Sequence, residues 1–498
     1  MKRRRNSTGF GRVKGNIEAE TVSELETQIL GSFLTNLPWE IIINILLRLP
    51  MKSILICRCV CKTLSTVISD PKFAKLHFKR GPKNDFLIRT NDPKRVSRTL
   101  YLVDFEPETF FKDECYCCDG IPEPNCKTHL KLDTKFKLPL RDAKMVLEKR
   151  CDGKGGVRKR RYIACKPKDD KFGVVNSCNG FLCLCGTKDS NPVVVCNPVT
   201  GEFIRLPEPS KIEKLRVPVY SGFGFYPSTN QYQVVRMYDH YIRDGDRGNQ
   251  WRHDSRVAEI HVLGTGSWRS IGSAPFVMDG FKFPTYLSGA IHWLCTDTHN
   301  KTSIVCFRFG NEKFQFFPPP PPGDFGTYDK STEQICLGEL RGCLYVCDAS
   351  SFFYNVNLWV MRKYGVGESW TKLSIKTGCE RWPYNGVYQL IKFIKEGAIL
   401  MYHSVSCLVY YDHKESGYKY IKVFGTPCKF EAIAHIPSLI LLKDAVIGDN
   451  VEVLNVNSRC AEFRLREENE VVFLGEGDSE LTDFGFSCSD NECVPRRR

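Results

Sequence analysis

Five residues between positions 115 and 129 are of the types that bind zinc. Cys115, Cys117 and Cys118 lie close together, and Cys126 and His129 follow in a Cys-x-x-His arrangement. Zinc prefers four cysteine or histidine ligands, and the Cys-x-x-His spacing suits such a site. The Cys-x-Cys-Cys string is crowded for one tetrahedral ion, however, and no second paired motif follows. We therefore expect a loop with reduced thiols here and keep a zinc site as the alternative.

Residue types that carry out catalysis form no recognisable motif in this sequence. There is no Gly-x-Ser-x-Gly string of the kind that presents a nucleophilic serine. The glycines at 153–156 lack the frame of a phosphate-binding loop. His292 and His403 each lie within an apolar run, which favours buried structural histidines. The sequence therefore predicts no catalytic residues, no bound metal and no cofactor.

Cysteine is abundant, with 24 among 498 residues, and its context indicates the compartment. The chain opens on a basic, polar segment without an apolar secretory signal, so we expect reduced thiols and no disulfides. Many cysteines lie in apolar runs, where a small buried side chain is the expected role. These are Cys183, Cys185, Cys196, Cys295, Cys306, Cys343 and Cys347. No apolar run reaches the roughly 18 residues of a membrane span, so we predict a protein of the cytoplasm or nucleus.

The formal net charge of +14 hides two opposed blocks. Residues 141–168 hold 11 basic and 3 acidic residues, and residues 451–492 hold 11 acidic and 3 basic residues. The basic run at 153–161 is read as a solvated loop, with a nuclear-import signal or a phosphate-binding patch as alternatives. No aromatic residue interrupts this run before Tyr162, which argues against base stacking and against nucleic-acid binding. The acidic block is typical of a weakly structured extension.

These residues need a framework, and its N-terminal part is a group of short helices. Residues 36–50 carry apolar side chains at helical spacing, including Ile41, Ile45 and Leu49, and Pro50 ends the segment. Three further helical segments are expected at 53–58, 60–68 and 72–78. Short helices in about 45 residues bury too little apolar area to be stable alone. We therefore expect the rest of the chain or a partner to cover them.

Two Leu-Pro pairs, Leu37-Pro38 and Leu49-Pro50, flank the first of these helices, and the string Cys59-Val-Cys-Lys62 follows. With these motifs the segment resembles an F-box of the type common in plant proteins. In that family the module binds the SKP-type adaptor of cullin-based SCF ubiquitin ligases. The resemblance implies adaptor-facing or module-core roles for Leu37, Pro38, Ile41, Ile45, Leu49, Pro50, Val60 and Cys61. Leu64 stands where the family has tryptophan, and the smaller side chain is expected to weaken docking.

From residue 172 onward, short apolar strands alternate with glycine and proline. A glycine opens an apolar strand at Gly180, Gly289, Gly342 and Gly397, and the last three are 53 and 55 residues apart. A second hairpin recurs with the same period. A hairpin cannot bury a face by itself, so these units need neighbours, and kelch-type propeller blades have this size. We predict a propeller of five to seven blades, with a β-sandwich as the alternative architecture.

Several strings of this region are found in one family, in the same order. They are residues 175–183, 196–201, 222–225, 267–269, 289–293 and 368–373. They resemble the F-box-associated interaction domains of plant F-box proteins. The polar segment 238–256 lengthens one unit. Strand-like segments at 85–90 and 99–104 are expected to complete the ring.

The predicted fold class is α+β and multidomain, with a small helical F-box followed by a mainly antiparallel β domain. The expected layout is a basic, disordered segment at 1–32, the F-box at 33–80, the β domain at 81–450 and an acidic extension at 451–498. A variable insertion at about 109–168 contains the cysteine cluster and the basic run, and we expect it to loop outward.

The resemblance implies a non-catalytic substrate receptor of an SCF-type ubiquitin ligase. The F-box would bind the SKP-type adaptor and through it a cullin, and the β domain would hold a target protein of unknown identity. Two alternatives stay open at this point. A propeller enzyme acting on glycans would need a central acid or metal constellation, and a basic adaptor for nucleic acid would use residues 141–168.

Overall fold

The computed structural model describes residues 37–474 with gaps. The gaps are 84, 91–98, 106–128, 131, 133, 140–143, 152–156, 165–171, 187–189, 209–218, 244–250, 276–277, 298–300, 322–333, 350–354, 377–386, 395–396, 405–406, 413, 415–416, 424–429, 447, 449–451, 457–462 and 467–470. The segment 1–32 and the cysteines of the loop for which zinc binding was the alternative, from Cys115 to Cys126, lie outside the described residues. The chain divides into two units: residues 1–139 with 171–456, and residues 140–170 with 457–498.

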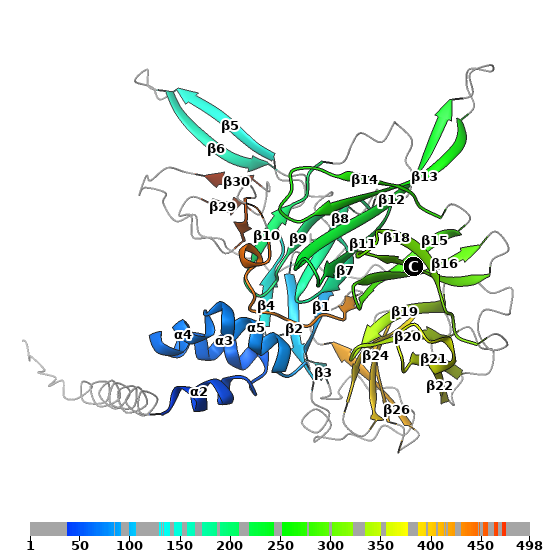
Figure 1. Cartoon of the computed structure of the whole chain (residues 1–498). Coiled ribbons are helices and arrows are strands. Elements are labelled where there is room, and N and C mark those ends of the chain that lie inside the picture. The colour runs from blue at the N-terminus through cyan, green and yellow to red at the C-terminus, as the bar shows by residue number, and fades with distance from the viewer. Residues whose placement is uncertain are drawn as a thin grey trace, which may run out of the picture. The chain divides into compact units, whose positions relative to one another are not determined.

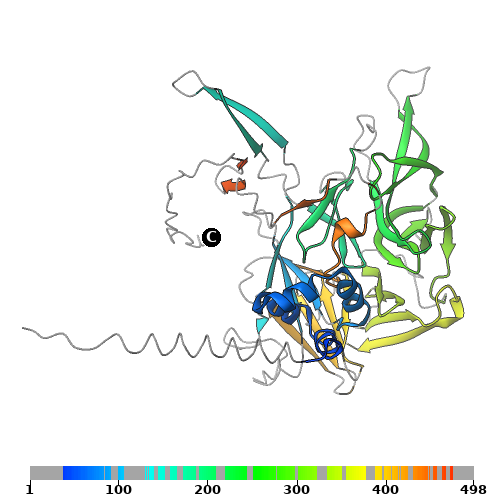
Figure 2. The same cartoon turned by 60° about the vertical axis from the view of Figure 1, so that its left-hand side comes forward.

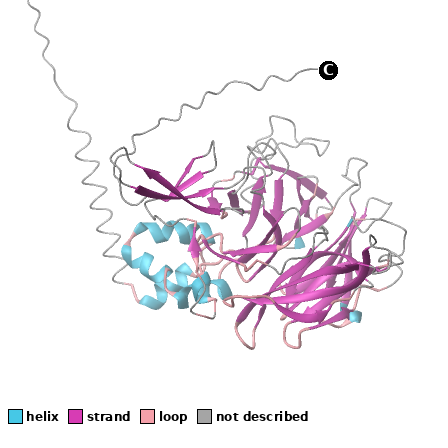
Figure 3. Ribbon diagram, turned by 90° about the horizontal axis from the view of Figure 1, so that it is seen from above, coloured by secondary structure: helices cyan, strands magenta, loops and turns pink. Residues whose placement is uncertain are grey.

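The first unit begins with a group of short helices. In the described residues these are α2 (Trp39–Leu46), α3 (Met51–Val60), α4 (Lys62–Ile68) and α5 (Pro71–Arg80), grouped together in Figure 3. Pro38 and Pro50 take the cap positions before α2 and α3, where the backbone N–H that proline lacks would have no acceptor within the helix. The extended backbone of Cys61 separates α3 from α4. The Asp70 carboxylate accepts from the backbone N–H of Lys72 at 2.6 Å and caps α5.

The described strands of the first unit form six mainly antiparallel sheets, the blades of a six-bladed β-propeller (Figure 1). Blade 1 contains β27 (Phe430–Ile433), β1 (Asp85–Thr90), β2 (Thr99–Asp104) and β4 (Thr134–Lys137). Blade 2 contains β7 (Phe172–Cys178), β8 (Phe181–Gly186), β9 (Pro192–Cys196) and β10 (Glu202–Arg205). Blade 3 contains β11 (Val219–Tyr226), β12 (Gln231–Arg243), β13 (Trp251–Val262) and β14 (Arg269–Ser273).

The last three blades follow in chain order. Blade 4 contains β15 (Met278–Leu287), β16 (Ala290–Asp297), β17 (Thr302–Arg308) and β18 (Lys313–Phe317). Blade 5 contains β19 (Ile335–Leu340), β20 (Cys343–Asp348), β21 (Asn355–Met361) and β22 (Trp370–Lys376). Blade 6 contains β23 (Tyr388–Phe393), β24 (Ile399–His403), β25 (Cys407–Asp412) and β26 (Gly417–Val423). The prediction of a propeller of five to seven blades is confirmed, and the β-sandwich alternative is wrong.

The recurring glycine of the sequence lies in the turn between the two innermost strands of a blade. In blade 2, Asn179 and Gly180 both have positive φ, at 48° and 84°. In blade 4, Ser288 and Gly289 repeat this geometry at 52° and 72°. A two-residue turn with both φ angles positive matches the twist of the strands it joins, and glycine adopts such an angle without strain. The sequence period therefore reflects a tight turn that recurs in blades 2, 4, 5 and 6, whereas the corresponding turn of blade 3 has four residues, 227–230.

The ring closes through strands from both ends of the propeller. Leu87 and Ile88 of β1 pair with Ile433 and Ala432 of β27, so blade 1 combines a segment directly after the helices with a late one. In Figure 2 the blue strands of this blade stand beside orange and yellow strands. The prediction that residues 85–90 and 99–104 complete the ring is confirmed.

Each pair of neighbouring blades buries its own apolar cluster. Along β8, for example, Leu182 and Leu184 pack toward blade 1, whereas Phe181 and Cys183 pack toward blade 3. Six such clusters occupy the six blade interfaces in the described residues. Because both faces of a blade are buried, its middle strands are continuously apolar instead of alternating. This explains why the sequence shows short apolar runs.

Two tryptophans of the repeated Ser-Trp strings link neighbouring blades. The Trp268 Nε1–H donates to the carbonyl O of Pro207 at 3.0 Å, and the Trp370 Nε1–H donates to the carbonyl O of Pro318 at 3.1 Å. In both cases the acceptor lies just after the last strand of the preceding blade. The repeat of these strings in the sequence thus reflects a repeated contact between blades.

The segment predicted as an insertion at 109–168 contributes to the propeller. Its residues Thr134–Lys137 are strand β4 of blade 1, and β3 (His129–Leu130) adds to β26 as a parallel fifth strand. The segment therefore does not all loop outward, because these residues complete two sheet edges. A further short strand, β28 (Leu454–Asn455), pairs with β10 of blade 2.

The second unit is a separate four-stranded sheet. Its order is β29 (Phe463–Arg466), β30 (Val471–Leu474), β6 (Val157–Ala164) and β5 (Lys144–Cys151). Strands β5 and β6 form a hairpin that carries most of the basic block, and β29 and β30 belong to the acidic block. The two charge blocks of the sequence are thus parts of one sheet.

Candidate protein-docking surface of the helical module

Helix α2 has one apolar side that packs inside the molecule and another that faces solvent. Ile42 and Leu46, one turn apart, are buried, with Ile42 only 4% exposed. Ile41 and Ile45, also one turn apart, are 44% and 50% exposed. Neighbouring positions on a helix are turned by about 100°, so the apolar stripe is wider than the chain itself covers.

Helix α3 repeats this arrangement. Met51 and Ile54 are buried, whereas Ile56 and Val60, one turn apart, are each 57% exposed. The described residues expose seven large apolar side chains, of which five lie on these two helices: Trp39, Ile41, Ile45, Ile56 and Val60. We call these five the exposed apolar set. Such a concentration marks a site of protein contact more often than a chance feature of a surface.

The residues named from the sequence separate into three groups. Pro38, Ile41, Ile45 and Val60 are exposed. A second group is half-buried at the edges of the helices: Leu37, Leu49, Pro50 and Cys61. Of these, Leu37, Leu49 and Cys61 contact the core. Leu64 is buried in that core, and its backbone N–H donates a hydrogen bond to Cys61 Sγ at 3.5 Å. A change at Leu64 would therefore act through packing of α4.

Three residues of this module were missed by the sequence reasoning. Trp39 and Ile56 belong to the exposed apolar set, and the spacing of Ile56 to Val60 was the signal that could have revealed the second of them. His77 is buried, and its Nε2 lies 3.1 Å from the carbonyl O of Leu49. Burial lowers the pKa of His77, so the ring is neutral and donates its proton to that carbonyl. This bond joins α5 to the segment after α2.

The inner sides of the helices share one apolar core with blades 1 and 2. From the helices this core takes Ile42, Leu46, Met51, Ile54, Leu64, Val67, Ile68 and Phe73. From the blades it takes Leu87, Leu100, Leu102, Phe136, Phe172, Leu182, Leu184, Val194 and Cys196. The helical module thus packs on the propeller, while the exposed apolar set stays uncovered.

Comparison with known proteins agrees with both parts of this architecture. Residues 34–76 match the family described as the F-box domain, and residues 144–439 match the family described as the F-box associated beta propeller domain. The second match covers more than half of the chain. The chain belongs to the F-box-associated β-propeller family.

Relatives of this F-box protein occur in Arabidopsis thaliana. It is 26% identical to "F-box protein At3g07870" over 442 residues, which is 82% of this chain and 93% of that protein. It is 26% identical to "F-box/kelch-repeat protein At3g23880", over 72% of this chain and 85% of that protein. It is 23% identical to "F-box protein CPR1", over 82% of this chain and 89% of that protein.

Solved structures that match this F-box protein include the Trypanosoma rangeli sialidase. That match has a TM-score of 0.29 and 12% identity, and it covers 54% of this chain and 51% of the sialidase. A similarity of this size carries no argument about activity.

Of the helices among the described residues, none has the length and apolar character needed to cross a membrane.

The histidines singled out in the propeller of this F-box protein are structural. His292 is fully buried, its Nδ1–H donates to the carbonyl O of Thr285 at 3.2 Å, and its Nε2 accepts from the Tyr364 hydroxyl at 2.9 Å. Burial lowers the pKa of His292 and of His403 to about 4. Among the described residues, no group of histidine, cysteine and carboxylate side chains could hold a metal ion.

The cysteines named from the apolar runs are buried, except Cys343, which is half-buried in the turn-facing start of β20. Burial raises the pKa of Cys196 and Cys295 to about 12. These thiols therefore stay protonated and unreactive at neutral pH. Cys59, next to Val60 of the exposed apolar set, is an exposed thiol.

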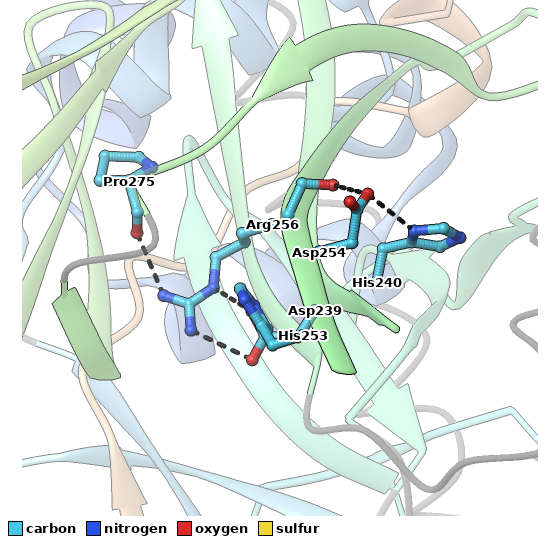
Figure 4. Close-up of polar contacts among 7 residues, drawn as sticks. Asp239, His240, His253, Asp254, Arg256 and Pro275 are labelled. Atoms are coloured by element: carbon cyan, nitrogen blue, oxygen red, sulfur yellow. Dashed lines mark hydrogen bonds and ion pairs between the residues drawn. The ribbon is translucent and has the colours of Figure 1, made fainter. Parts of the chain in front are cut away.

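The polar insertion of the sequence extends one hairpin of this F-box protein. β11 pairs with β12 only as far as Tyr238, but β12 and β13 continue to pair up to Arg243 and Trp251. An isolated two-stranded hairpin is marginally stable, and ion pairs stabilise its base (Figure 4). Arg256 Nε donates to Asp239 Oδ1 at 2.7 Å, and another of its nitrogens donates to the carbonyl O of Pro275 at 3.1 Å.

Further polar contacts lie beyond this base. His253 Nε2 is 3.2 Å from Asp239, and His240 Nδ1 is 3.4 Å from Asp254, which lies at an irregularity in the pairing of β12 with β13 (Figure 4). Burial would raise the pKa of Asp239, but the hydrogen bonds and charges of Arg256 and His253 outweigh it and hold that pKa below its usual value. Asp239 is therefore ionised, and the base of the hairpin is an ion pair that is mostly shielded from water.

Proposed function

We propose that this F-box protein is the substrate-recognition subunit of an SCF-type ubiquitin ligase. In this proposal the helical module binds an SKP-type adaptor, and through it a cullin, in the cytoplasm or nucleus. The propeller holds a target protein for ubiquitination. The protein itself performs no chemistry: it raises the effective concentration of the target near the ligase.

The observation that carries the proposal is the exposed apolar set on α2 and α3. Complete burial of one such side chain is worth about 1.5–3 kcal/mol, so several together supply enough free energy for a stable complex. Of the residues named from the sequence, we assign direct contact to Pro38, Ile41, Ile45 and Val60. Leu37, Leu49, Pro50 and Cys61 would border the contact, and Leu64 would support it from the core.

The shared core gives this arrangement a mechanical consequence. Because the helices and blades 1 and 2 bury side chains in one cluster, the helical module is not a freely tethered element. A target bound by the propeller would be presented to the ligase in a restricted orientation. Restricted geometry increases the effective concentration further than a flexible link of equal length.

The proposal is tested by co-purification with a recombinant SKP-type adaptor. We expect Ile45→Asp and Ile56→Asp each to lower adaptor affinity about 100-fold or more, because each change removes apolar burial and desolvates a carboxylate. Both positions are exposed in the free chain, so the thermal stability should change little.

The propeller offers a matched control for these variants. Phe316 of β18 is 67% exposed and lies outside the helical module. Phe316→Asp should therefore retain full adaptor binding. If Ile45→Asp and Ile56→Asp bind the adaptor as well as Phe316→Asp does, the proposed docking role of α2 and α3 is wrong.

A further inference from the structure

The helical module carries a strong excess of positive charge. Residues 37–83 contain nine basic and two acidic side chains, and all eleven are exposed. The acidic ones are Glu40, in the first turn of α2, and Asp70, whose carboxylate already caps α5. The basic ones are Arg48, Lys52, Arg58, Lys62, Lys72, Lys75, Lys79, Arg80 and Lys83.

Two of these basic residues continue the exposed apolar stripes of the helices. Side chains three or four residues apart on a helix lie on the same face. Arg48 follows Ile45 by three residues, and its backbone N–H donates to the carbonyl O of Ile45 at 3.1 Å. On α3, Lys52, Ile56 and Val60 are each four residues apart, and all three are exposed. Both apolar stripes therefore end in a positive charge.

Two more basic residues flank the end of α3. Arg58 lies between Ile56 and Val60, and Lys62 begins α4 two residues after Val60. Within the described part of the chain, neither Arg58 nor Lys62 has an ion-pair partner. Residues 41–69 contain four basic side chains and no acidic one. The exposed apolar set therefore has a basic border to which this segment contributes no carboxylate.

An apolar surface with a basic border restricts the chemistry of its partner. Exposed isoleucine and valine side chains gain free energy only when apolar groups cover them. Charges at the rim of an interface are commonly matched by opposite charges on the partner, which accelerates association. An acidic protein surface with an apolar centre meets both requirements, whereas the phosphate backbone of a nucleic acid matches only the border.

We propose that the protein surface that covers the exposed apolar set has an acidic rim, with carboxylates opposite Arg48, Lys52, Arg58 and Lys62. This inference rests on the proposed function and specifies its partner: the SKP-type adaptor presents an apolar centre surrounded by carboxylates. The remaining basic residues of α5 add to the same positive field, which attracts the acidic partner before contact.

The salt dependence of adaptor binding tests this proposal. Surface plasmon resonance with the full-length chain and a recombinant SKP-type adaptor measures both rate constants from about 50 to about 500 mM NaCl. The association rate constant should fall about tenfold or more over this range, because salt screens exposed charges. The dissociation rate constant should change less than about threefold, since burial of the apolar set does not depend on this screening.

A pair of matched variants locates the charges. Arg58→Gln with Lys62→Gln should lower the association rate constant about tenfold at low salt and much less at high salt. The control, Arg362→Gln with Lys363→Gln, removes the same two charges from an exposed segment after β21 of blade 5, across the ring from blade 2. This control should bind like the natural protein. All four side chains are exposed, so both variants should unfold at nearly the natural temperature.

Cross-linking identifies the opposed carboxylates directly. A carbodiimide should join Lys62 to an aspartate or glutamate of the adaptor and should not join Lys363 to it. If the adaptor binds with an association rate that ignores salt, or if both double variants slow association equally, the acidic rim is wrong and the proposed function stands. If the adaptor does not bind the natural chain at any salt concentration, both are wrong.

Nucleic acid is the alternative occupant of the basic border. A single-stranded oligonucleotide in about tenfold excess should leave the adaptor bound at physiological salt, because it cannot cover the apolar set. Displacement of the adaptor by the oligonucleotide, lost in Arg58→Gln with Lys62→Gln, would assign the border to nucleic acid and overturn the proposal.

Discussion

Arg89 of β1 forms an ion pair with Glu431 of β27, 342 residues further along the chain. The same guanidinium donates to the carbonyl O of Phe172 in β7. One buried side chain therefore joins the first strand after the helices, the late strand that closes blade 1, and the start of blade 2. The ring closes where the helical module packs.

We expect Arg89→Met to destabilise the protein by about 2 kcal/mol, because it removes two charge-assisted hydrogen bonds at the closure. Urea unfolding followed by intrinsic fluorescence measures the loss. Arg269→Met is the control, since the ion pair of Arg269 with Glu312 is exposed and is worth at most about 1 kcal/mol. Equal losses in the two variants would contradict a special role of Arg89 in closure.

Arg236 lies fully buried between blades 2 and 3, paired with Glu259 and stacked 4.7 Å from the Trp268 ring centre. Arg236→Met should cost about 3–5 kcal/mol, because Glu259 then remains buried without its partner. The double variant Arg236→Met with Glu259→Leu should recover much of this loss. Calorimetric unfolding of both proteins provides the comparison, and a double variant no more stable than the single one would refute the reasoning.

Thiol labelling should report on the proposed docking surface. Iodoacetamide should modify Cys59 in the native protein and should reach Cys183, Cys196 and Cys347 only after unfolding, because these core thiols are buried. Adaptor binding should slow the labelling of Cys59, which neighbours Val60, by about tenfold or more. Cys343, the half-buried thiol on the propeller, is the internal control, and peptide mass spectrometry reads each site. Unchanged labelling of Cys59 in the complex would place the adaptor elsewhere.

Buried histidines should make the stability depend on pH. Burial lowers the pKa of His292 and His403 to about 4 and that of His435 to about 3, whereas the unfolded chain has a value of about 6.5. At a pH between the folded and unfolded pKa values, the unfolded chain binds more protons than the folded chain. The stability that depends on these histidines is therefore complete above pH 6.5 and decreases as the pH falls below it. Glu339, whose pKa burial raises, acts in the opposite direction.

A variant isolates the histidine contribution to this pH dependence. Relative to the natural protein, the free energy of unfolding of His292→Gln should increase by up to about 1.4 kcal/mol for each pH unit below 6.5. Urea midpoints at pH 7.5, 6.5, 5.5 and 4.5 give the difference. His240→Gln serves as the control because that side chain is exposed. A difference that stays constant with pH would show that His292 does not titrate differently in the folded state.

Local patterns predicted much of the architecture. Pro50 and the glycines of the hairpin turns act on the backbone next to them, so their positions in the sequence are enough to mark where elements end or turn. The approximate 53–55-residue period followed for the same reason, since blades 4, 5 and 6 repeat the same glycine at the turn. The strands at 85–90 and 99–104 were also recognisable, because each is a short strand-like segment that lies outside the repeating units.

Other features depend on residues that meet only in three dimensions. Nothing near Arg89 in the sequence indicates Glu431 as its partner, and the four strands of the second unit come from segments about 300 residues apart. Trp39 and Ile56 were missed because helical spacing shows that a side is apolar but not whether the chain covers it. His77 was missed because its acceptor is a backbone carbonyl, which the side-chain sequence does not display.

The helices, the hairpins and the propeller class could be predicted from the order of the residues, because capping, turn geometry and apolar periodicity act over a few residues. Which apolar side chains of α2 and α3 are buried and which remain available to a partner could be seen only in the folded chain. The reason is that burial depends on what packs against a helix, and here that surface is built from blades 1 and 2, whose strands come from both ends of the propeller.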